Sequence, residues 1–576
     1  MMGIPNLVLG SGMDSFAMMR KKNAYYVDKT GYIPLLENLP EKAFTMLRPR
    51  KFGKSLFLSM LETYYDIAHE DKFESLFSGL EIMHHLTQEH SKYQILHFDF
   101  SKIKSGNISN LPDEFNKYCN KRLNDFMIKY ERFYDERFKR EFFNLDTPSL
   151  KIDSLKYARD NYDFKYYFII DEYDNFTNDV LNANGKGVYE KITHGDGFLR
   201  NSFKDYKDSF SRIMIFGILP ITINDLTSGY NIGEDISFLP QFNSMLGFSK
   251  EEVKTLIVKF QNQGKLQEID AEQLVMEITP WYNNYCFSEG ALKQERVFNC
   301  EMVLHFLRSL LMWGKAPKNM ICKNTLFDYN KLDSLIDKNS KRIFEKIVAM
   351  DSVSSKISPS FSALEIRKNY NFISLLYYYG LLTITGYSLG QYILSIPNLN
   401  IKSEQYEYIG NRILEKAQVT ADRLEEEIKY MSQDGKYKKC LENVADIYTA
   451  TYSNRDLKDH EYVPQGVIAA ILYCCGSQYI VRKESELNGG YCDIILTPSL
   501  DSFADVNHSY IIETKICRNK TELNSVLKQA ESQLRKYQND KQIKKAIGKT
   551  RLHLLAMILS AGKLICLQEF HLPDQR

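Results

Sequence analysis

The chain has 576 residues, more than one hydrophobic core supports, which predicts roughly two to four domains. Hydrophobic residues make up 44% and charged residues 26%, the balance of an ordinary globular protein. The net charge of +1 excludes a general attraction to polyanions, so any contact with nucleic acid has to come from a local patch.

The sequence also argues against a membrane-spanning helix and against a fold held together by disulfide bonds. No uninterrupted apolar run reaches the roughly 18 residues that a bilayer-spanning helix needs, and the N-terminus lacks a basic-then-apolar signal segment. The cysteines are scattered, with Cys474 and Cys475 adjacent and no Cys-x-x-Cys, a spacing that fits neither a zinc ribbon nor a disulfide scaffold. We therefore expect a cytoplasmic protein with reduced thiols and no membrane partner.

The most informative local motif is Arg-Pro-Arg-Lys-Phe-Gly-Lys-Ser at residues 48–55. It follows a β-prone apolar run and precedes apolar residues at helical spacing, which is the strand–loop–helix context of a phosphate-binding loop. Backbone N–H groups and the helix N-terminus would face the phosphates, and Lys54 would supply the counter-charge. The candidate nucleotide-binding residues of the loop are Arg50, Phe52, Gly53, Lys54 and Ser55.

One position of this loop departs from the usual pattern, which has glycine five residues before Gly53. The chain has Arg48 there, followed by Pro49. Both residues restrict the backbone where the chain turns, so the sequence predicts a stiff loop that binds nucleotide and turns it over slowly.

A second acidic motif lies downstream, where five apolar residues from Tyr166 to Ile170 run into Asp171 and Glu172. Asp171 would hold Mg²⁺ through water alongside the Ser55 hydroxyl. Glu172 would orient and deprotonate the attacking water. A buried strand that ends in solvated acids is the alternative, but the upstream Gly-Lys-Ser favours a nucleotide site.

Two further segments complete the N-terminal pattern. The buried run 212–220 is expected to lie between the two strands above in a doubly wound sheet. The run Asn-Ala-Tyr-Tyr-Val-Asp-Lys-Thr at 23–30 has two interpretations. Either Asp28 or Thr30 caps a helix over 31–36, or this segment contacts the base or ribose of the nucleotide.

Together these motifs resemble the bacterial AAA-ATPase-like family, and the resemblance continues through 226–232, 246–249 and 281–287. In that family the loop typically reads Arg-Pro-Arg-Arg-Phe-Gly-Lys-Ser, which implies that Arg48 is a family feature. The resemblance implies ATP and Mg²⁺ as cofactors. Asn284 and Cys286 stand where the family more often has glycine and arginine, so a nucleotide-sensing role of that arginine does not carry over.

The middle of the chain is expected to be mostly helical. Residues 372–382 predict an apolar helix, with its tyrosines in the core, followed by a β-hairpin up to residue 397. This arrangement suggests a lid or winged-helix-like segment. Residues 401–435 predict a charged connecting helix that breaks at Ser-Gln-Asp-Gly, 432–435.

A second chemical centre is predicted in the last 140 or so residues, where a helix from 461 is followed by strands around 478–482, 491–496 and 510–515. Asp493 opens one strand, and Glu513 and Lys515 lie on one face of the next. Asp493 and Glu513 would bind one or two Mg²⁺ ions, and Lys515 would position or help to deprotonate the attacking water.

This constellation resembles the PD-(D/E)xK nuclease superfamily, specifically the domain found C-terminal to AAA-ATPase-like domains. The resemblance includes Glu484 and Glu486 before a glycine pair, and the helix with Gln533 and Tyr537; the eponymous proline is absent. A retained nuclease fold without activity is the alternative. The stretch 518–551 is strongly basic, which favours either phosphate binding or a solvated helix face.

The predicted fold class is α/β. A three-layer P-loop NTPase domain (1–248) is followed by a helical or winged-helix-like lid (249–400), a helical connector (401–440) and a restriction-endonuclease-like α/β domain (441–576).

The predicted function is that of an ATP-binding, ATP-hydrolysing protein whose nucleotide state gates a Mg²⁺-dependent nuclease. Nucleic acid is the expected partner, DNA ahead of RNA, with a homo-oligomer and an unidentified protein partner left open. One alternative is a nucleotide-dependent interaction switch with a catalytically weak C-terminal domain. Another is an ATPase that works on a protein partner and carries a nucleic-acid-binding module.

Overall fold

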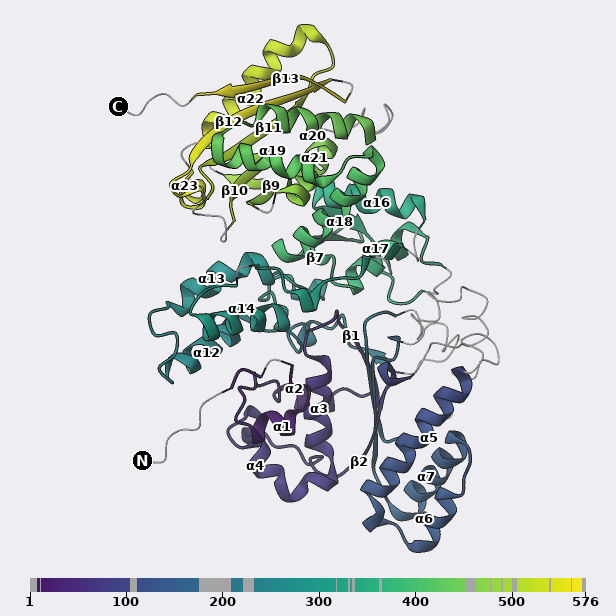
Figure 1. Cartoon of the computed structure of the whole chain (residues 1–576). Coiled ribbons are helices and arrows are strands. Elements are labelled where there is room, and N and C mark those ends of the chain that lie inside the picture. The colour runs from purple at the N-terminus through teal and green to yellow at the C-terminus, as the bar shows by residue number, and fades with distance from the viewer. Residues whose placement is uncertain are drawn as a thin grey trace. The chain divides into compact units, whose positions relative to one another are not determined.

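The computed structural model describes residues 8–10, 12–103, 111–175, 209–220, 233–317, 319–329, 332–333, 337–361, 365–451, 462–476, 478–487, 490–499, 505–537, 540–560 and 562–571. The chain forms two compact units (Figure 1). Unit 1 comprises Met1–Pro317, Cys322–Ser340 and Ser354–Asn398, and unit 2 comprises Lys318–Ile321, Lys341–Val353 and Leu399–Arg576.

Unit 1 is built on a five-stranded parallel sheet of order β2-β3-β4-β1-β5. Its first and third strands in the chain are buried along their whole length, as expected for a parallel sheet covered on both faces. The order confirms that the run 212–220 supplies the strand between the other two. The strands are β1 (Ala43–Leu47), β2 (Gln94–Asp99), β3 (Tyr166–Asp171), β4 (Arg212–Gly217) and β5 (Glu234–Asp235).

Helices flank this sheet on two sides, which gives the predicted three layers (Figure 1). One group, drawn in purple, contains α1 (Phe16–Lys21), α2 (Tyr32–Glu37), α3 (Lys54–Tyr65) and α4 (Phe73–Phe77). The other group, drawn in blue, contains α5 (Leu111–Lys129), α6 (Glu136–Phe143) and α7 (Pro148–Tyr162).

The segment before α2 does not cap that helix, so the capping interpretation is wrong. The N-cap is Gly31, which makes no side-chain cap bond. Asp28 instead accepts hydrogen bonds from Thr30 N at 2.9 Å and from Glu81 N at 2.7 Å, and Thr30 Oγ1 accepts one from Ile82 N at 3.1 Å. These bonds fasten the segment to the chain beyond α4.

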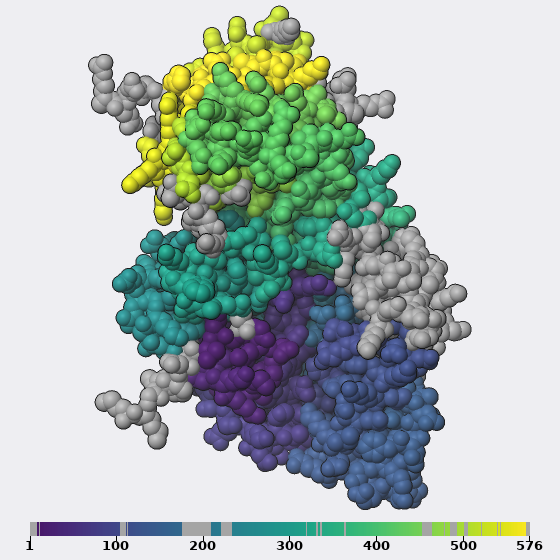
Figure 2. All heavy atoms as spheres, viewed as in Figure 1, coloured from purple at the N-terminus to yellow at the C-terminus, as the bar shows by residue number. Residues whose placement is uncertain are grey.

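The rest of unit 1 is mostly helical and ends in a hairpin, as predicted. The tyrosines of 372–382 are largely in the core, with Tyr377 and Tyr378 both 3% exposed. Space-filling Figure 2 shows the teal helices of residues 250–313 against the purple N-terminal segment. The elements are α12 (Lys250–Gln261), α13 (Ala271–Tyr282), α14 (Cys300–Trp313), α17 (Asn369–Tyr378), β7 (Thr383–Ser388) and β8 (Gln391–Ser395). Two elements lie where the chain passes between units, α16 (Lys338–Met350) and β6 (Ser352–Ser355).

The part of unit 2 from Leu399 onward begins with four helices. The single connecting helix predicted over 401–435 is wrong, because the chain leaves the helical conformation at 418–420, but the predicted break at 432–435 is confirmed. The second ends at Gly435, whose φ of 72° is the left-handed conformation that glycine adopts without strain. The four are α18 (Leu399–Ala417), α19 (Ala421–Asp434), α20 (Lys438–Thr451) and α21 (Tyr462–Cys475).

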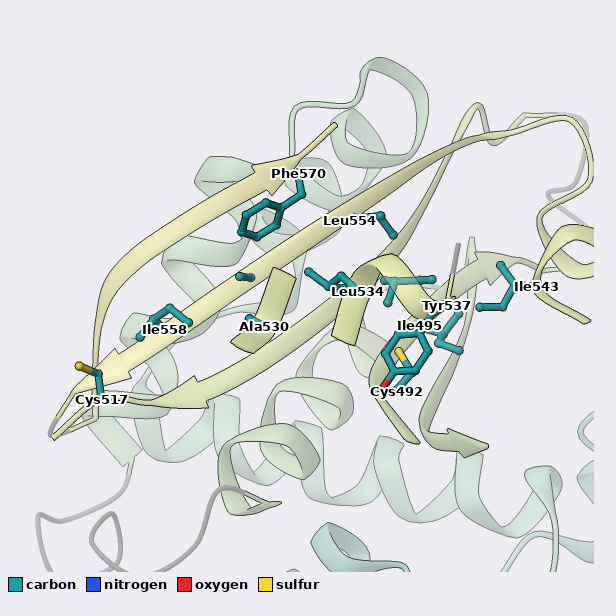
Figure 3. Close-up of a cluster of buried hydrophobic side chains, with 12 residues drawn as sticks. Cys492, Ile495, Cys517, Ala530, Leu534, Tyr537, Ile543, Leu554, Ile558 and Phe570 are labelled. Atoms are coloured by element: carbon teal, nitrogen blue, oxygen red, sulfur yellow. The ribbon is translucent and has the colours of Figure 1, made fainter. Parts of the chain in front are cut away.

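The sheet of unit 2 is mixed, with order β13-β12-β11-β10-β9. Only the β11–β12 pair is parallel. Figure 3 shows the apolar cluster between this sheet and α22, including Ile495, Leu534 and Ile558. The elements are β9 (Tyr479–Leu487), β10 (Gly490–Pro498), β11 (His508–Ile516), α22 (Leu523–Tyr537), α23 (Lys541–Ile547), β12 (Arg551–Ser560) and β13 (Lys563–Phe570).

The two-unit division assigns residues 249–317 and 354–398 to unit 1 and the whole of 399–440 to unit 2. The finer boundaries at 248/249 and 440/441 stay predictions. Within the described ranges, no helix combines the length and the apolar character needed to cross a lipid bilayer.

Candidate functional site

The loop between β1 and α3 has the shape that a phosphate cradle needs. Gly53 is the N-cap of α3 with φ 90°, and a Cβ at this position would meet only Cys300 Sγ, at 3.8 Å. Lys51 is also left-handed, at φ 67°. Two carbonyls of the loop are fixed by hydrogen bonds from distant parts of the chain. Phe52 O accepts from Gly247 N at 3.0 Å, and Arg50 O accepts from Asn299 Nδ2 at 3.2 Å.

Arg48 stands apart from this cradle. Its side chain is 1% exposed and its guanidinium donates to the carbonyls of Leu47, Ser237 and Phe242 at 2.9–3.0 Å. It also stacks on Phe287, with 4.1 Å between the guanidinium carbon and the ring centroid. Burial lowers its pKa to about 10. Position 48 is not left-handed, so arginine in place of glycine costs no backbone strain there.

Lys54 and Ser55 begin α3, and Ser55 contacts its predicted partner Asp171. Lys54 Nζ donates to the carbonyls of Arg48 and Pro49 at 2.9 and 2.8 Å, within its own loop. Burial lowers the pKa of this lysine. Ser55 Oγ donates to Asp171 Oδ2 at 2.7 Å, which joins the loop to the end of β3. The two oxygens predicted to hold Mg²⁺ in unit 1 therefore lie side by side.

Glu172 follows in a strained backbone conformation, with φ 51°. Its N–H donates to Asp171 Oδ1 at 2.9 Å, and its carbonyl accepts from Asn175 N at 3.0 Å. Burial raises the pKa of its carboxyl, while Lys54 opposes that shift. A carboxylate with a raised pKa is a better proton acceptor at neutral pH, as a general base requires.

The next two residues fasten Glu172 to the end of β4, a contact that sequence reasoning missed. Buried Asp174 accepts from Ile218 N at 3.1 Å and from Leu219 N at 3.0 Å. The Tyr173 hydroxyl donates to the carbonyl of Leu219. Both polar groups of the Leu219 backbone are therefore held by the acidic motif. The family-like motif at 226–232 lies outside the described residues.

A cavity of 540 Å³ opens beside the phosphate loop. The stretch from Arg50 to Phe57 and Glu172 line one part of the cavity, so all the predicted nucleotide-binding residues of the loop line it. The remaining walls are largely apolar and come from segments far apart in the chain: Leu9, Met13, Tyr25, Val27, Leu246, Phe248, Leu256 and Leu304. The interpretation of 23–30 as a nucleotide-contact segment is thus consistent with its place on the wall.

One ion pair joins two walls of the cavity. Lys29 Nζ lies 2.7 Å from Glu252 Oε1 and donates to Ser244 O at 2.9 Å. Glu252 also completes the capping box of α12 with Ser249. The N-terminal segment and α12 are thereby linked through a pair whose side chains are 10% and 26% exposed.

The residues of this site fit a nucleoside triphosphate with Mg²⁺. The loop presents a left-handed glycine and a helix N-terminus to phosphate, with Arg50, Lys51 and Lys54 as cations on the cavity wall. The donor pair of a serine hydroxyl and a carboxylate is oxygen-only, as Mg²⁺ prefers.

The three residues predicted to form the second centre lie together in unit 2. Lys515 Nζ lies 2.9 Å from Glu513 Oε1 on the same face of β11. Asp493 Oδ2 accepts from Thr514 N at 2.7 Å and from Thr514 Oγ1 at 3.0 Å. The β10–β11 pairing ends at Ile494 opposite Ile512, so the Asp493 carboxylate takes the place of the next backbone partner.

Burial and mutual repulsion set the charge of these acids. Burial, followed by the negative charge of Asp493, raises the pKa of Glu513 to about 7. Burial also raises the pKa of Asp493, against the opposing effect of Lys515. Glu513 Oε2 is buried and has no protein hydrogen-bond partner. An orphaned carboxylate oxygen beside a second carboxylate fits a Mg²⁺ ion, which would supply the missing charge.

Two further residues neighbour this pair, and sequence reasoning missed the first of them. Gln465 of α21 hydrogen-bonds Asp493 with its side chain. Tyr537 of α22, which belongs to the resemblance described above, is 1% exposed, and burial, followed by the negative charge of Glu513, raises its pKa. Among the described residues no group of three or more His, Cys, Asp or Glu could enclose a metal. Glu461 and the side chains of Glu484 and Glu486 lie outside the described part.

The basic stretch lies on α22, α23 and the start of β12, and many of its cations are exposed. Its acids are occupied: Glu531 pairs with Arg535 at 2.7 Å, and Asp540 caps α23 by accepting from Ile543 N at 3.1 Å. The exposed cations are Arg518, Lys528, Arg535, Lys536, Lys541, Lys544, Lys545, Lys549 and Arg551.

Comparison with known proteins gives two family matches. Residues 10–227 match a predicted AAA-ATPase family, the AAA-ATPase-like family. Residues 459–569 match the PD-(D/E)XK nuclease superfamily.

Two individual proteins also match. An uncharacterized protein in the vnfD 5′ region of Azotobacter chroococcum mcd 1 is 26% identical over 287 residues. The match covers 49% of each chain, so this chain spans about half the length of that relative. The crystal structure of Cdc6p from Pyrobaculum aerophilum aligns with 66% of this chain and 91% of that one, at 10% identity and a TM-score of 0.24. At that TM-score the likeness has no bearing on the fold.

The two matched regions contain the phosphate loop with its acidic partner, and the Asp493, Glu513 and Lys515 constellation. The N-terminal part of the chain, over residues 10–227, therefore carries a region similar to the AAA-ATPase-like family, and residues 459–569 carry a region similar to the PD-(D/E)XK nuclease superfamily.

Proposed function

We propose that this protein binds and slowly hydrolyses ATP, and that its nucleotide state gates a Mg²⁺-dependent nuclease in the same chain. The observation that carries the proposal is the presence of two assembled sites in one polypeptide. The Ser55–Asp171 pair lies beside a phosphate cradle, and the Asp493, Glu513 and Lys515 constellation lies in a sheet of the second unit.

In the proposed ATPase site, the loop N–H groups and Lys54 bind the phosphates, and Ser55 and Asp171 hold Mg²⁺. Lys54 exchanges its two loop carbonyls for phosphate oxygens, a gain in charge complementarity. Glu172 accepts the proton of the attacking water, and its raised pKa suits that role. The contacts of Tyr173 and Asp174 with Leu219 keep this glutamate in its strained orientation.

In the proposed nuclease site, Asp493 and Glu513 hold the metal and Lys515 orients the attacking water. Bound Mg²⁺ supplies charge that stabilises the phosphoryl transition state. Glu513, whose raised pKa favours the protonated form, would hold the ion as an ionised carboxylate, and Lys515 would then share that carboxylate with the ion. The exposed cations of α22 and α23 offer the counter-charge for a nucleic-acid backbone, DNA ahead of RNA.

The direct test measures both activities in the full chain. We expect phosphate release that Lys54→Ala and Glu172→Gln abolish, and plasmid nicking with Mg²⁺ that Lys515→Ala abolishes. We also expect the nicking rate to depend on ATP in the wild type and not in Lys54→Ala. Arg137→Ala, which changes an exposed α6 side chain, serves as the neutral control.

The outcomes separate the candidate functions. Loss of cleavage on every DNA and RNA substrate, with nucleotide binding retained, would replace the nuclease by a nucleotide-dependent interaction switch. Cleavage that ignores ATP would leave two independent enzymes and remove the gating. RNA cut in preference to DNA would reverse the substrate assignment.

A further inference from the structure

Helix α21 carries a buried glutamine that holds one of the two proposed metal-binding carboxylates. Gln465 lies in the first turn of α21, is 6% exposed and hydrogen-bonds Asp493. The same carboxylate accepts two bonds from Thr514 of β11. Asp493 is thus fixed from two separate elements, and its orientation depends on where α21 lies relative to the sheet.

Helix α21 in turn cannot move independently of two neighbouring helices. A Cβ built on Gly410 of α18 would lie 2.7 Å from Ala470 O and 2.6 Å from Cys474 Cβ. A Cβ on Gly466 would lie 2.4 Å from Ala349 Cα of α16. Only glycine permits contacts this close, so α21 touches both helices backbone to backbone. Close packing of this kind transmits displacement instead of absorbing it.

Helices α16 and α18 also lie at two of the places where the chain enters unit 2, in addition to the short stretch Lys318–Ile321. The chain passes between the units at 340/341, within α16, and at 398/399, immediately before α18. Lys416–Glu345 at 3.2 Å joins the two helices, and Lys402–Asp351 at 2.7 Å joins α18 to the residue that follows α16. Any displacement of the chain at these passages therefore acts first on α16 and α18.

We propose that Gln465 is a positioning residue through which α16, α18 and α21 set the Mg²⁺ affinity of Asp493. The nucleotide state of unit 1 then changes the metal affinity of the proposed nuclease site. This inference rests on the proposed function, because it names a route for the gating. It adds a residue, a set of helix contacts and a measurable quantity to that function.

The test is a Mg²⁺ titration of the full chain, followed by hydrogen–deuterium exchange of the β10 and β11 amides. This readout reports metal binding in unit 2 separately from the nucleotide site and needs no cleavage. In Gln465→Met we expect the half-maximal Mg²⁺ concentration to rise at least about tenfold, the usual effect of losing a bond that orients a metal ligand. We also expect ATP to shift this concentration in the wild type and not in the variant.

Two further variants complete the design. Gln568→Met removes an exposed amide from β13 and is expected to match the wild type. Gly410→Ala leaves both carboxylates and their donors intact but forces α18 away from α21, so it is expected to lose the ATP shift. If Gln465→Met loses exchange protection throughout unit 2, its titration no longer reports on Asp493 alone, and the ATP shift in Gly410→Ala then tests the proposal.

An unchanged half-maximal Mg²⁺ concentration in Gln465→Met would overturn the positioning role. A full ATP shift in Gly410→Ala would overturn the helix route. Absence of any ATP shift in the wild type would instead refute the proposed gating, and the Gln465→Met titration would still decide the positioning role.

Discussion

At the scale of single residues, Arg48 shows how an apparent defect in a motif becomes a structural anchor. Its guanidinium holds the carbonyls of Ser237 and Phe242 and packs on Phe287, all more than 180 residues away in the chain. A motif comparison detects the missing glycine but contains no information about these distant partners. These contacts tie the start of the phosphate loop to segments that are distant in sequence but adjacent in unit 1.

Replacing Arg48 should therefore cost stability more than chemistry. Arg48→Met leaves three buried carbonyls without donors, and we expect a loss of about 3 kcal/mol in the free energy of unfolding of unit 1. Thermal unfolding monitored by calorimetry measures this loss. The exposed Arg137→Met on α6 is the matched control and should stay within about 0.5 kcal/mol of the wild type. Equal stability of the two variants would contradict the anchoring role.

The buried carboxyl of Glu513 predicts an unusual pH dependence of unit 2. Its pKa is raised from an ordinary 4.5 to about 7 in the folded state, so the folded chain binds the extra proton between these values. Stability from this group is fully present below pH 4.5 and is lost as the pH rises through 7, by on the order of 3 kcal/mol without Mg²⁺.

Denaturant unfolding of the Mg²⁺-free protein across this pH range tests the expectation. Glu513→Gln cannot titrate, so its unit 2 should lose little stability over the same interval. Added Mg²⁺ should restore more stability at pH 7.5 than at pH 5, because the ion binds the ionised carboxylate. A wild-type stability that rises from pH 5 to 7.5 together with that of Glu513→Gln would argue against a raised pKa.

At the scale of elements, the Lys29–Glu252 pair joins the N-terminal segment to α12 across the nucleotide cavity. We expect Lys29→Met and Glu252→Gln to weaken ATP binding, chiefly through faster dissociation, because the two walls lose their link. A double-mutant cycle on ATP affinity should give a coupling energy on the order of 1–3 kcal/mol for this partly buried pair.

The same helix supplies the comparison. Lys254 pairs with Glu272 at 2.6 Å, but both side chains are well exposed, at 39% and 57%. Lys254→Met should leave ATP dissociation unchanged. If the two pairs behave alike, Lys29–Glu252 is an ordinary surface interaction and not a link across the cavity.

Elements with strong local signals were predictable, and elements defined by distant contacts were not. Five apolar residues before Asp171 and Glu172 predict β3 because burial of a parallel strand leaves its mark on consecutive residues. The αL position of Asn284, at φ 77°, fits the glycine that the family more often has there. By contrast, Asp28 and Thr30 bond to residues 81 and 82, a choice that no local helix-capping pattern encodes.

The candidate sites divide in the same way. Spacing along β11 placed Glu513 and Lys515 on one face, since alternation in a strand is a local property. The apolar cavity walls, the Tyr173–Asp174 contact with Leu219 and the Gln465 bond to Asp493 join segments that approach only through tertiary packing. From the sequence alone, Gln465 could have been identified as a candidate site residue only by asking which polar side chain of α21 is buried.

At the scale of the whole molecule, two compact units with separate ligands predict two separable unfolding transitions. ATP at about 100 times its Kd should stabilise unit 1 by roughly 2.7 kcal/mol, and Mg²⁺ should stabilise unit 2 through Asp493 and Glu513. Differential scanning calorimetry of the full chain with each ligand in turn tests this expectation.

Lys54→Ala should remove the ATP effect on the first transition and spare the Mg²⁺ effect on the second. Because multi-domain chains seldom unfold in one step, the transitions need to be fitted separately. One cooperative transition that both ligands raise equally would mean that the units unfold as a single body, and the gating would then act through shared stability.

The end of the β10–β11 pairing has a practical consequence for the design of an inactive variant that tests the proposed nuclease activity. Asp493 serves two purposes at once, since the oxygen that accepts from Thr514 N stands in for a backbone carbonyl of the sheet. Removing that carboxylate would loosen the strands as well as the metal, so a loss of cleavage would not distinguish a blocked reaction from a damaged scaffold. The bond from Thr514 N goes to Asp493 and not to Lys515, so replacing Lys515 tests the reaction while this link between the two strands is kept.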